Sequence, residues 1–66
     1  MQITVNGKSR QAADELDLAE LVREISDRST GIAVARNGEV VPRGSWSDTA
    51  VRPDDRIDVV TAVQGG

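Results

Sequence analysis

Residues 17–25, Asp17-Leu18-Ala19-Glu20-Leu21-Val22-Arg23-Glu24-Ile25, decide how this chain folds. Their apolar side chains recur at the spacing i, i+3, i+4 and i+7, which places them on one stripe of an α-helix. Asp17 is expected to cap the start of this helix, with Glu20 as the second member of a capping box. A helix with a single apolar stripe needs one sheet face to cover. We therefore expect the rest of the chain to supply one sheet.

The segment before the helix predicts a β-hairpin. Polar and apolar residues alternate from Gln2 to Val5, so Ile3 and Val5 are expected to face a core. Asn6-Gly7 follows and is typical of a two-residue type I′ turn, because both positions of that turn require positive φ. The returning strand, residues 8–12, is polar and is expected at an edge of the sheet.

The segment after the helix predicts a second hairpin and a last strand. Residues 32–35 and 39–41 flank the turn signal Asn37-Gly38. Pro42 is expected to end this hairpin, because proline cannot donate a hydrogen bond to a strand ladder. The last strand is expected to run over residues 56–63.

Residues 43–52, between the second hairpin and the last strand, are expected to be irregular. They contain the only aromatic residue of the chain, Trp46. Trp46 can either contact a partner or fill the end of a small core. We favour the core, since little else in this segment could fill the volume.

These elements predict one small α+β domain over residues 1–66. Its sheet would be mixed and four- to five-stranded, with the helix on one face and residues 63–66 as an exposed, extended Gly-Gly tail. The other face of the sheet would carry small, mostly uncharged side chains, so a partner could dock there. Ordinary exposed strand residues are the alternative interpretation. The residues of this outer face are Gln2, Thr4, Ala33, Ala35, Val60 and Ala62.

The composition argues against several classes of function. The 66 residues include no cysteine and no histidine, so a thiol nucleophile, a disulfide and the commonest general base and metal ligand are all absent. A self-contained enzyme is therefore not expected, nor a metal site. The net charge of −3 disfavours nucleic acid and anionic membranes as main partners. No apolar run approaches the ~20 residues that span a bilayer, and no signal peptide is evident, so we expect a soluble cytoplasmic protein.

The C-terminal stretch predicts the chemistry. A β-rich run passes directly into Gly65-Gly66. Because glycine has no Cβ, such a tail is thin and can thread a narrow channel. It would deliver the α-carboxylate of Gly66, which has a pKa of about 3.5 and is ionised at neutral pH. A carboxylate can attack the α-phosphate of a nucleotide and form an acyl adenylate. A frayed terminus is the alternative interpretation.

The order of the elements, together with the two C-terminal glycines, resembles the ubiquitin-like β-grasp fold. Within it, the chain resembles the ThiS family of sulfur carrier proteins in thiamin biosynthesis. The segment Pro-Arg-x-x-Trp is the most discriminating, because the related carrier of molybdopterin synthesis is usually longer and lacks it. One departure is Asp54, where the family usually has glycine. The residues that carry the resemblance are Asn37, Val41-Pro42-Arg43, Trp46, Asp55-Arg56-Ile57 and Gly65-Gly66.

The resemblance implies a carrier that is a co-substrate, with no catalytic residue and no cofactor of its own. A ThiF-like enzyme would adenylate Gly66 with ATP, and Gly65 would give access to that enzyme. Sulfur from cysteine, supplied through a cysteine desulfurase, would convert the terminus to a thiocarboxylate for a thiazole synthase. The alternatives are a ubiquitin-like protein modifier, a sulfur carrier for another pathway such as molybdopterin synthesis, and a pure binding module. For a modifier, the single lysine of the chain, Lys8, leaves little scope for chain building.

Overall fold

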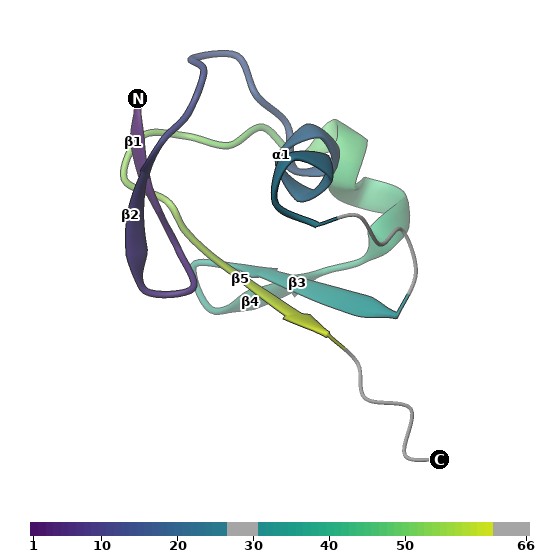
Figure 1. Ribbon diagram of the computed structural model, residues 1–66. Helices are drawn as coiled ribbons and strands as arrows, with labels where there is room; N and C mark the ends of the chain where they lie inside the picture. The colour runs from purple at the N-terminus through teal and green to yellow at the C-terminus, as the bar shows by residue number, and fades with distance from the viewer. Residues whose placement is uncertain (27–30, 62–66) are drawn as a thin grey trace.

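The computed structural model describes residues 1–26 and 31–61 (Figure 1). Its strands form one five-stranded sheet in the order β2-β1-β5-β3-β4, and the helix α1 lies over one face of that sheet (Figure 1). The predicted α+β class with a mixed sheet is confirmed. The elements are β1 (Gln2–Val5), β2 (Lys8–Gln11), α1 (Leu18–Ile25), β3 (Ile32–Arg36), β4 (Glu39–Val41), the 3-10 helix η1 (Arg43–Asp48) and β5 (Arg56–Thr61).

The predicted capping box starts helix α1. The Glu20 backbone N–H donates to Asp17 Oδ1 at 2.8 Å, and the Asp17 backbone N–H donates to Glu20 Oε1 at 3.3 Å. These bonds satisfy two of the donors that a helix leaves free at its N-terminus. The helix ends at Ile25, where the Ser26 backbone N–H donates to the Val22 carbonyl at 2.9 Å. Local hydrogen bonds therefore set the start of the helix where the sequence predicted it.

Strand β5 lies at the centre of the sheet, between β1 and β3. It pairs in parallel with β1, with Thr4 opposite Arg56, and antiparallel with β3, with Val34 opposite Val59. The polar strand β2 lies at one edge, as predicted, and β4 lies at the other. Within the described residues, β5 runs to Thr61, so the predicted continuation to residue 63 lies outside the described part of the chain.

The core lies between the sheet and α1. Ile3, Val34 and Ile57 face it from the three central strands, and the apolar stripe of α1 covers them, as the alternation and the helical spacing predicted. Burial of these side chains supplies the main favourable term in folding. The buried apolar residues are Ile3, Leu16, Leu18, Leu21, Val22, Val34, Trp46, Val51 and Ile57.

Trp46 belongs to this core, with 6% of its surface exposed. Its indole Nε1–H donates to the Val41 carbonyl at 2.9 Å, so the one polar atom of the ring also has a partner. The prediction that Trp46 is core is confirmed. The prediction that the whole of residues 43–52 is irregular is wrong, because residues 43–48 form η1.

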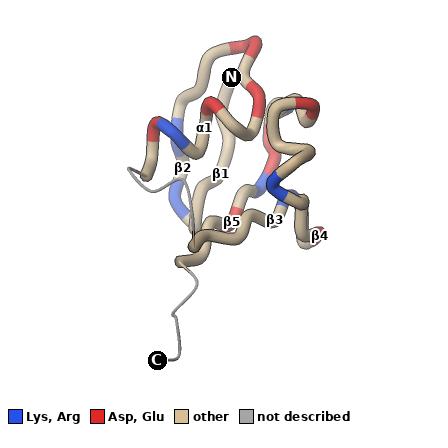
Figure 2. The backbone as a smooth tube through the Cα atoms, turned by 90° about the vertical axis from the view of Figure 1, so that its right-hand side faces the viewer, with Lys and Arg blue, Asp and Glu red and all other residues tan. Residues whose placement is uncertain are grey.

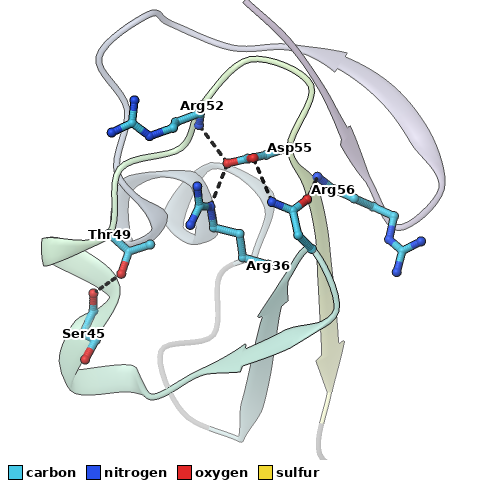
Figure 3. Close-up of polar contacts among 7 residues, drawn as sticks. Arg36, Ser45, Thr49, Arg52, Asp55 and Arg56 are labelled. Atoms are coloured by element: carbon cyan, nitrogen blue, oxygen red, sulfur yellow. Dashed lines mark hydrogen bonds and ion pairs between the residues drawn. The ribbon is translucent and has the colours of Figure 1, made fainter.

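Short-range hydrogen bonds hold η1 in its compact form. The Ser45 N–H donates to the Pro42 carbonyl at 2.8 Å, and the Thr49 hydroxyl donates to the Ser45 carbonyl at 2.7 Å (Figure 3). Short 3-10 turns of this kind are common connectors. Here the turn places the Trp46 ring inside the core.

None of the helices within residues 1–26 and 31–61 has the length and apolar character that a membrane-crossing helix needs.

Candidate functional site

The candidate site consists of the outer face of the sheet and of β5, the strand that leads toward the C-terminus. Gly65 and Gly66, which sequence analysis singles out as the reacting tail, lie outside the described residues, as does Ala62 of the predicted outer face. The structure describes the approach to the tail as far as Thr61. In Figure 1, β5 ends at the lower right of the view, at the opposite end of the molecule from the N-terminus.

An apolar patch occupies the outer face. Pairing places Ala33 opposite Val60 and Ala35 opposite Val40. Val60 is 59% exposed and Val40 is 74% exposed, although large apolar side chains are usually buried. We call Ala33, Ala35, Val40 and Val60 the outer patch. Exposed apolar side chains gathered on one face of a sheet can form part of a protein interface.

The outer face includes residues that the sequence predicted there and others that it did not. Thr4, Ala33, Ala35 and Val60 lie on it as predicted, because strand alternation determines which side chains share a face. Val40 was missed, since β4 is only three residues long and its alternation gives a weak signal. Asp58, which pairs with Ala35, and Arg56, which pairs with Thr4, are charged residues of this face that were also missed, and they form a 3.5 Å ion pair.

The outer face becomes more polar toward β1 and β2. Gln2 is exposed there, and its side-chain amide donates to the Ser9 hydroxyl at 3.0 Å. This bond joins the two strands of the first hairpin across the face, where the pairing places Thr4 opposite Ser9. The apolar part of the face is therefore confined to the half of the sheet formed by β5, β3 and β4.

Acidic charge gathers away from the outer patch. Figure 2 shows acidic residues on the loop before α1 and at η1. Five acidic residues, from this loop, the first turn of α1 and η1, line part of a pocket of about 350 Å³. No group of three or more acidic residues in the described part of the chain is arranged to hold a metal ion. The acidic residues that line the pocket are Asp14, Glu15, Asp17, Glu20 and Asp48.

A buried carboxylate holds the start of β5. Asp55 is 6% exposed, and its Oδ2 accepts from Arg36 Nε at 2.8 Å and from the Arg52 backbone N–H at 2.8 Å (Figure 3). Its Oδ1 accepts from the Asn37 side-chain amide at 3.0 Å. Burial by itself raises the pKa of Asp55, but these hydrogen bonds outweigh it and hold the pKa below its ordinary value. The carboxylate is therefore charged at neutral pH and ties two turns to β5.

This arrangement explains why Asn37, Asp55 and Arg56 appear together in the resemblance. Asn37 donates to the Asp55 carboxylate, and its Oδ1 accepts from the Arg56 backbone N–H at 2.9 Å. Residues that lie 18 and 19 positions apart in the sequence thus meet at the first residue of β5. Asp54, where the family usually has glycine, has a φ of +68°, in the left-handed region that aspartate tolerates better than most residues. The turn before β5 is retained in spite of the departure.

Similarity to known proteins covers the whole chain. A sequence model of the ThiS family matches residues 3–66. The chain belongs to the ThiS family. The sulfur carrier protein ThiS of Escherichia coli (strain K12) is 33% identical over 66 residues, and the alignment covers 100% of both chains. The crystal structure of thiamine biosynthesis protein ThiS from Geobacter metallireducens matches with a TM-score of 0.88 and 30% identity, again over 100% of both chains.

A thiazole synthase also contains a segment similar to this member of the ThiS family. The protein from Paramagnetospirillum magneticum (strain ATCC 700264 / AMB-1) is 32% identical over 66 residues, and the chain spans 20% of that relative's length. The predicted family and its β-grasp fold are confirmed. The name of the E. coli relative agrees with the prediction of a carrier protein and not an enzyme.

Proposed function

We propose that this protein is a cytoplasmic sulfur carrier of thiamin biosynthesis and that the α-carboxylate of Gly66 carries the sulfur. The observation that carries this proposal is the match to the ThiS family over residues 3–66, which includes both C-terminal glycines. The E. coli relative, aligned over its full length, is named a sulfur carrier protein. The proposed domain is residues 1–66, with 63–66 as its reactive tail.

The proposed cycle starts with activation of the tail. A ThiF-like enzyme binds ATP, a Gly66 carboxylate oxygen attacks the α-phosphate, and pyrophosphate leaves. Hydrosulfide then attacks the acyl carbon of the adenylate and AMP leaves, so that a thiocarboxylate remains. Cysteine, through a desulfurase, is the proposed source of this sulfur, and a thiol reductant releases it from the persulfide of the desulfurase as hydrosulfide. Gly65 has no Cβ and keeps the tail narrow enough to enter the enzyme.

A thiazole synthase is the proposed acceptor of the sulfur. In the relative from P. magneticum, a segment similar to this whole chain forms a fifth of a thiazole synthase. Two functions that occur in one polypeptide commonly act on the same substrate, so a separate carrier and synthase are expected to meet. Transfer of the sulfur, with an oxygen atom from the acceptor or from water taking its place on the acyl carbon, would return Gly66 to the carboxylate and make the carrier available for another cycle.

The outer patch is the proposed docking surface for the adenylating enzyme. It includes Val60 of β5, the strand from which the tail continues, so an enzyme that covers the patch would be close to the tail. Residues 62–66 can extend by at most roughly 18 Å beyond Thr61, since an extended chain spans no more than about 3.6 Å per residue. Docking and reaction must therefore occur within a short distance of each other.

Mass spectrometry of the intact protein tests the proposal directly. The wild-type protein is incubated with the ThiF-like enzyme, ATP and inorganic sulfide, and we expect its mass to rise by the difference between sulfur and oxygen. One alanine added after Gly66 should abolish this change, because it moves the reacting carbon by up to ~3.6 Å along an extended chain. An error of ~1 Å in position can cost roughly 100-fold in rate. Gly65→Val should act in the same way.

A matched control carries one alanine inserted after Ala13, in the exposed loop before α1. It has the same added residue and an unchanged tail, so it should be loaded normally, and all variants should melt near the wild type. Loading of the C-terminally extended protein at the wild-type rate would show that the tail is not the reacting group. Isopeptide-linked adducts in cell lysate, without a thiocarboxylate, would instead indicate a protein modifier.

A further inference from the structure

The two Asn-Gly turns hold the central strand β5 from opposite sides. Asn6 begins the turn between β1 and β2, and Asn37 begins the turn between β3 and β4. Their φ angles are +50° and +52°, in the left-handed region that asparagine adopts more readily than most residues. The Asn6 backbone N–H donates to the Ile57 carbonyl at 2.9 Å, and the Asn37 backbone N–H donates to the Arg56 carbonyl at 2.8 Å.

The side chain of each asparagine adds a second bond to the same strand. Asn6 Oδ1 accepts from the Val59 backbone N–H at 2.8 Å, and Asn37 Oδ1 accepts from the Arg56 backbone N–H at 2.9 Å. The two contacts differ in position along β5. Asn37 acts at the first residue of the strand, beside the buried Asp55, whereas Asn6 acts three residues further toward the C-terminus.

The Asn6 side chain replaces a backbone partner that the turn removes. The paired residues of β1 and β5 end at Val5 and Ile57, because the chain turns at Asn6. In a parallel ladder, the residue that donates to the Ile57 carbonyl would accept from the Val59 N–H through its own carbonyl. Asn6 makes the first bond with its backbone and the second with its side chain. Without Oδ1, the Val59 N–H would lose its acceptor on the β1 side of β5.

We propose that Asn6 is a positioning residue for the reaction at Gly66, a role that rests on the proposed function above. By accepting a hydrogen bond from the Val59 N–H, its side chain fixes the direction of the last part of β5, from which the tail continues. Asn37 acts at the other end of the strand, where it secures the fold. Loss of the Asn6 side chain should therefore impair the reaction of a bound carrier, while loss of the Asn37 side chain should mainly impair stability.

Three variants separate these roles. Asn6→Gly keeps the left-handed backbone and its N–H without strain, and removes only the side-chain acceptor. Asn6→Asp retains an oxygen that can accept from Val59, and it also tolerates positive φ, so it is the rescue variant. Asn37→Gly is the matched control, with the same substitution at the equivalent residue of the other turn. All are measured at a temperature at which melts show each to be folded.

Two measurements are made on each variant. Hydrogen exchange at the Val59 amide should be faster in Asn6→Gly and close to wild type in Asn6→Asp. In loading with the ThiF-like enzyme, ATP and sulfide, Asn6→Gly should lower kcat about tenfold, as expected for a small error in the position of the reacting atoms. KM should change by less than about twofold, since the outer patch is untouched, and Asn6→Asp should restore kcat. Asn37→Gly should lower Tm and leave kcat of the folded protein near wild type.

The outcomes are distinguishable. Wild-type loading together with an unaffected kcat in Asn6→Gly would overturn the positioning role and leave the proposed function standing. An equal fall of kcat in Asn37→Gly and Asn6→Gly would also overturn it, because the effect would then be one of general destabilisation. A wild-type protein that is never loaded would overturn the proposed function, and the role of Asn6 with it.

Discussion

The two faces of the sheet are built from alternate residues of the same strands, yet their side chains differ sharply in exposure to solvent. On the face that α1 covers, Ile57 is fully buried, and on the outer face Val60, three residues later, is 59% exposed. The covered face holds the fold together, and the outer face is available to a partner. Substitutions on the covered side should therefore change stability, and those on the outer face should change partner binding.

Trp46→Ala should show the largest loss of stability on the covered side. Truncation of a large buried aromatic residue typically costs ~3–5 kcal/mol, and here it also removes the Nε1 donor to the Val41 carbonyl. Denaturant melts measure the loss, with Trp46→Phe as a control that keeps most of the volume. An unchanged midpoint combined with lost partner binding would assign Trp46 to an interface instead.

Asp55→Ala should cause the next largest loss of stability, roughly 2–3 kcal/mol, because each buried group left without a hydrogen-bond partner costs about 1–3 kcal/mol. The Arg52 N–H and Arg36 Nε would lose their shared acceptor. Chemical denaturation at pH 7 gives the value. A cost below ~0.5 kcal/mol would mean that this carboxylate contributes little to holding β5.

The pH dependence of stability supplies a control for Asp55. Its pKa is lowered in the folded protein, so the folded state binds fewer protons than the unfolded state as the pH falls. Its contribution is complete above the unfolded pKa of about 3.9 and is lost as the pH drops through the lower folded pKa. The wild type should therefore lose more stability than Asp55→Ala when the pH is lowered from about 5 to below the pKa of Asp55 in the folded protein. Parallel losses in the two proteins would contradict this account.

Asp17→Ala should cost about 1 kcal/mol, the usual loss for a removed helix cap. The Glu20 N–H would lose its 2.8 Å acceptor at the start of α1. Since Asp17 lies on the helix side of the molecule, thiocarboxylate formation by the folded fraction should remain normal. Slow loading without any change in the melt would place Asp17 in contact with the activating enzyme and weaken the contrast between the faces.

Val60→Lys should change stability least and binding most. Exposed substitutions usually stay within about 0.5 kcal/mol, whereas an apolar side chain that becomes buried in an interface contributes roughly 1.5–3 kcal/mol. KM for the adenylating enzyme should therefore rise at least about tenfold, since each 1.4 kcal/mol is a factor of ten. Ala13→Lys adds the same charge in the exposed loop that follows β2, at the edge of the sheet opposite β4, and should leave KM unchanged. Equal KM values for both variants would exclude the outer patch as the docking surface.

The sequence by itself determined the features that depend on neighbouring residues. The capping box of Asp17 and Glu20 involves residues three apart, so its hydrogen bonds could be predicted from spacing alone. The Asn-Gly turns follow from the demand for positive φ. Alternation along the strands placed Ala33 and Val60 on one face and Val34 and Ile57 on the other. Family resemblance pointed to the tail, which no contact within residues 1–26 and 31–61 could have indicated.

Only the tertiary structure decided which distant segments meet. It placed β5 between β1 and β3 and brought Asn6 to Val59 across 53 positions of sequence. From the sequence, both asparagines could be assigned only to turns. Their side chains also accept hydrogen bonds from β5, a strand that is far from each turn in the sequence. Asp55 was named from the sequence as part of the family resemblance, and its burial and its contacts with Arg36 and Asn37 show that it holds the start of β5. Hydrogen bonds between residues far apart in the sequence depend on how the core packs, and a local sequence pattern does not predict that packing.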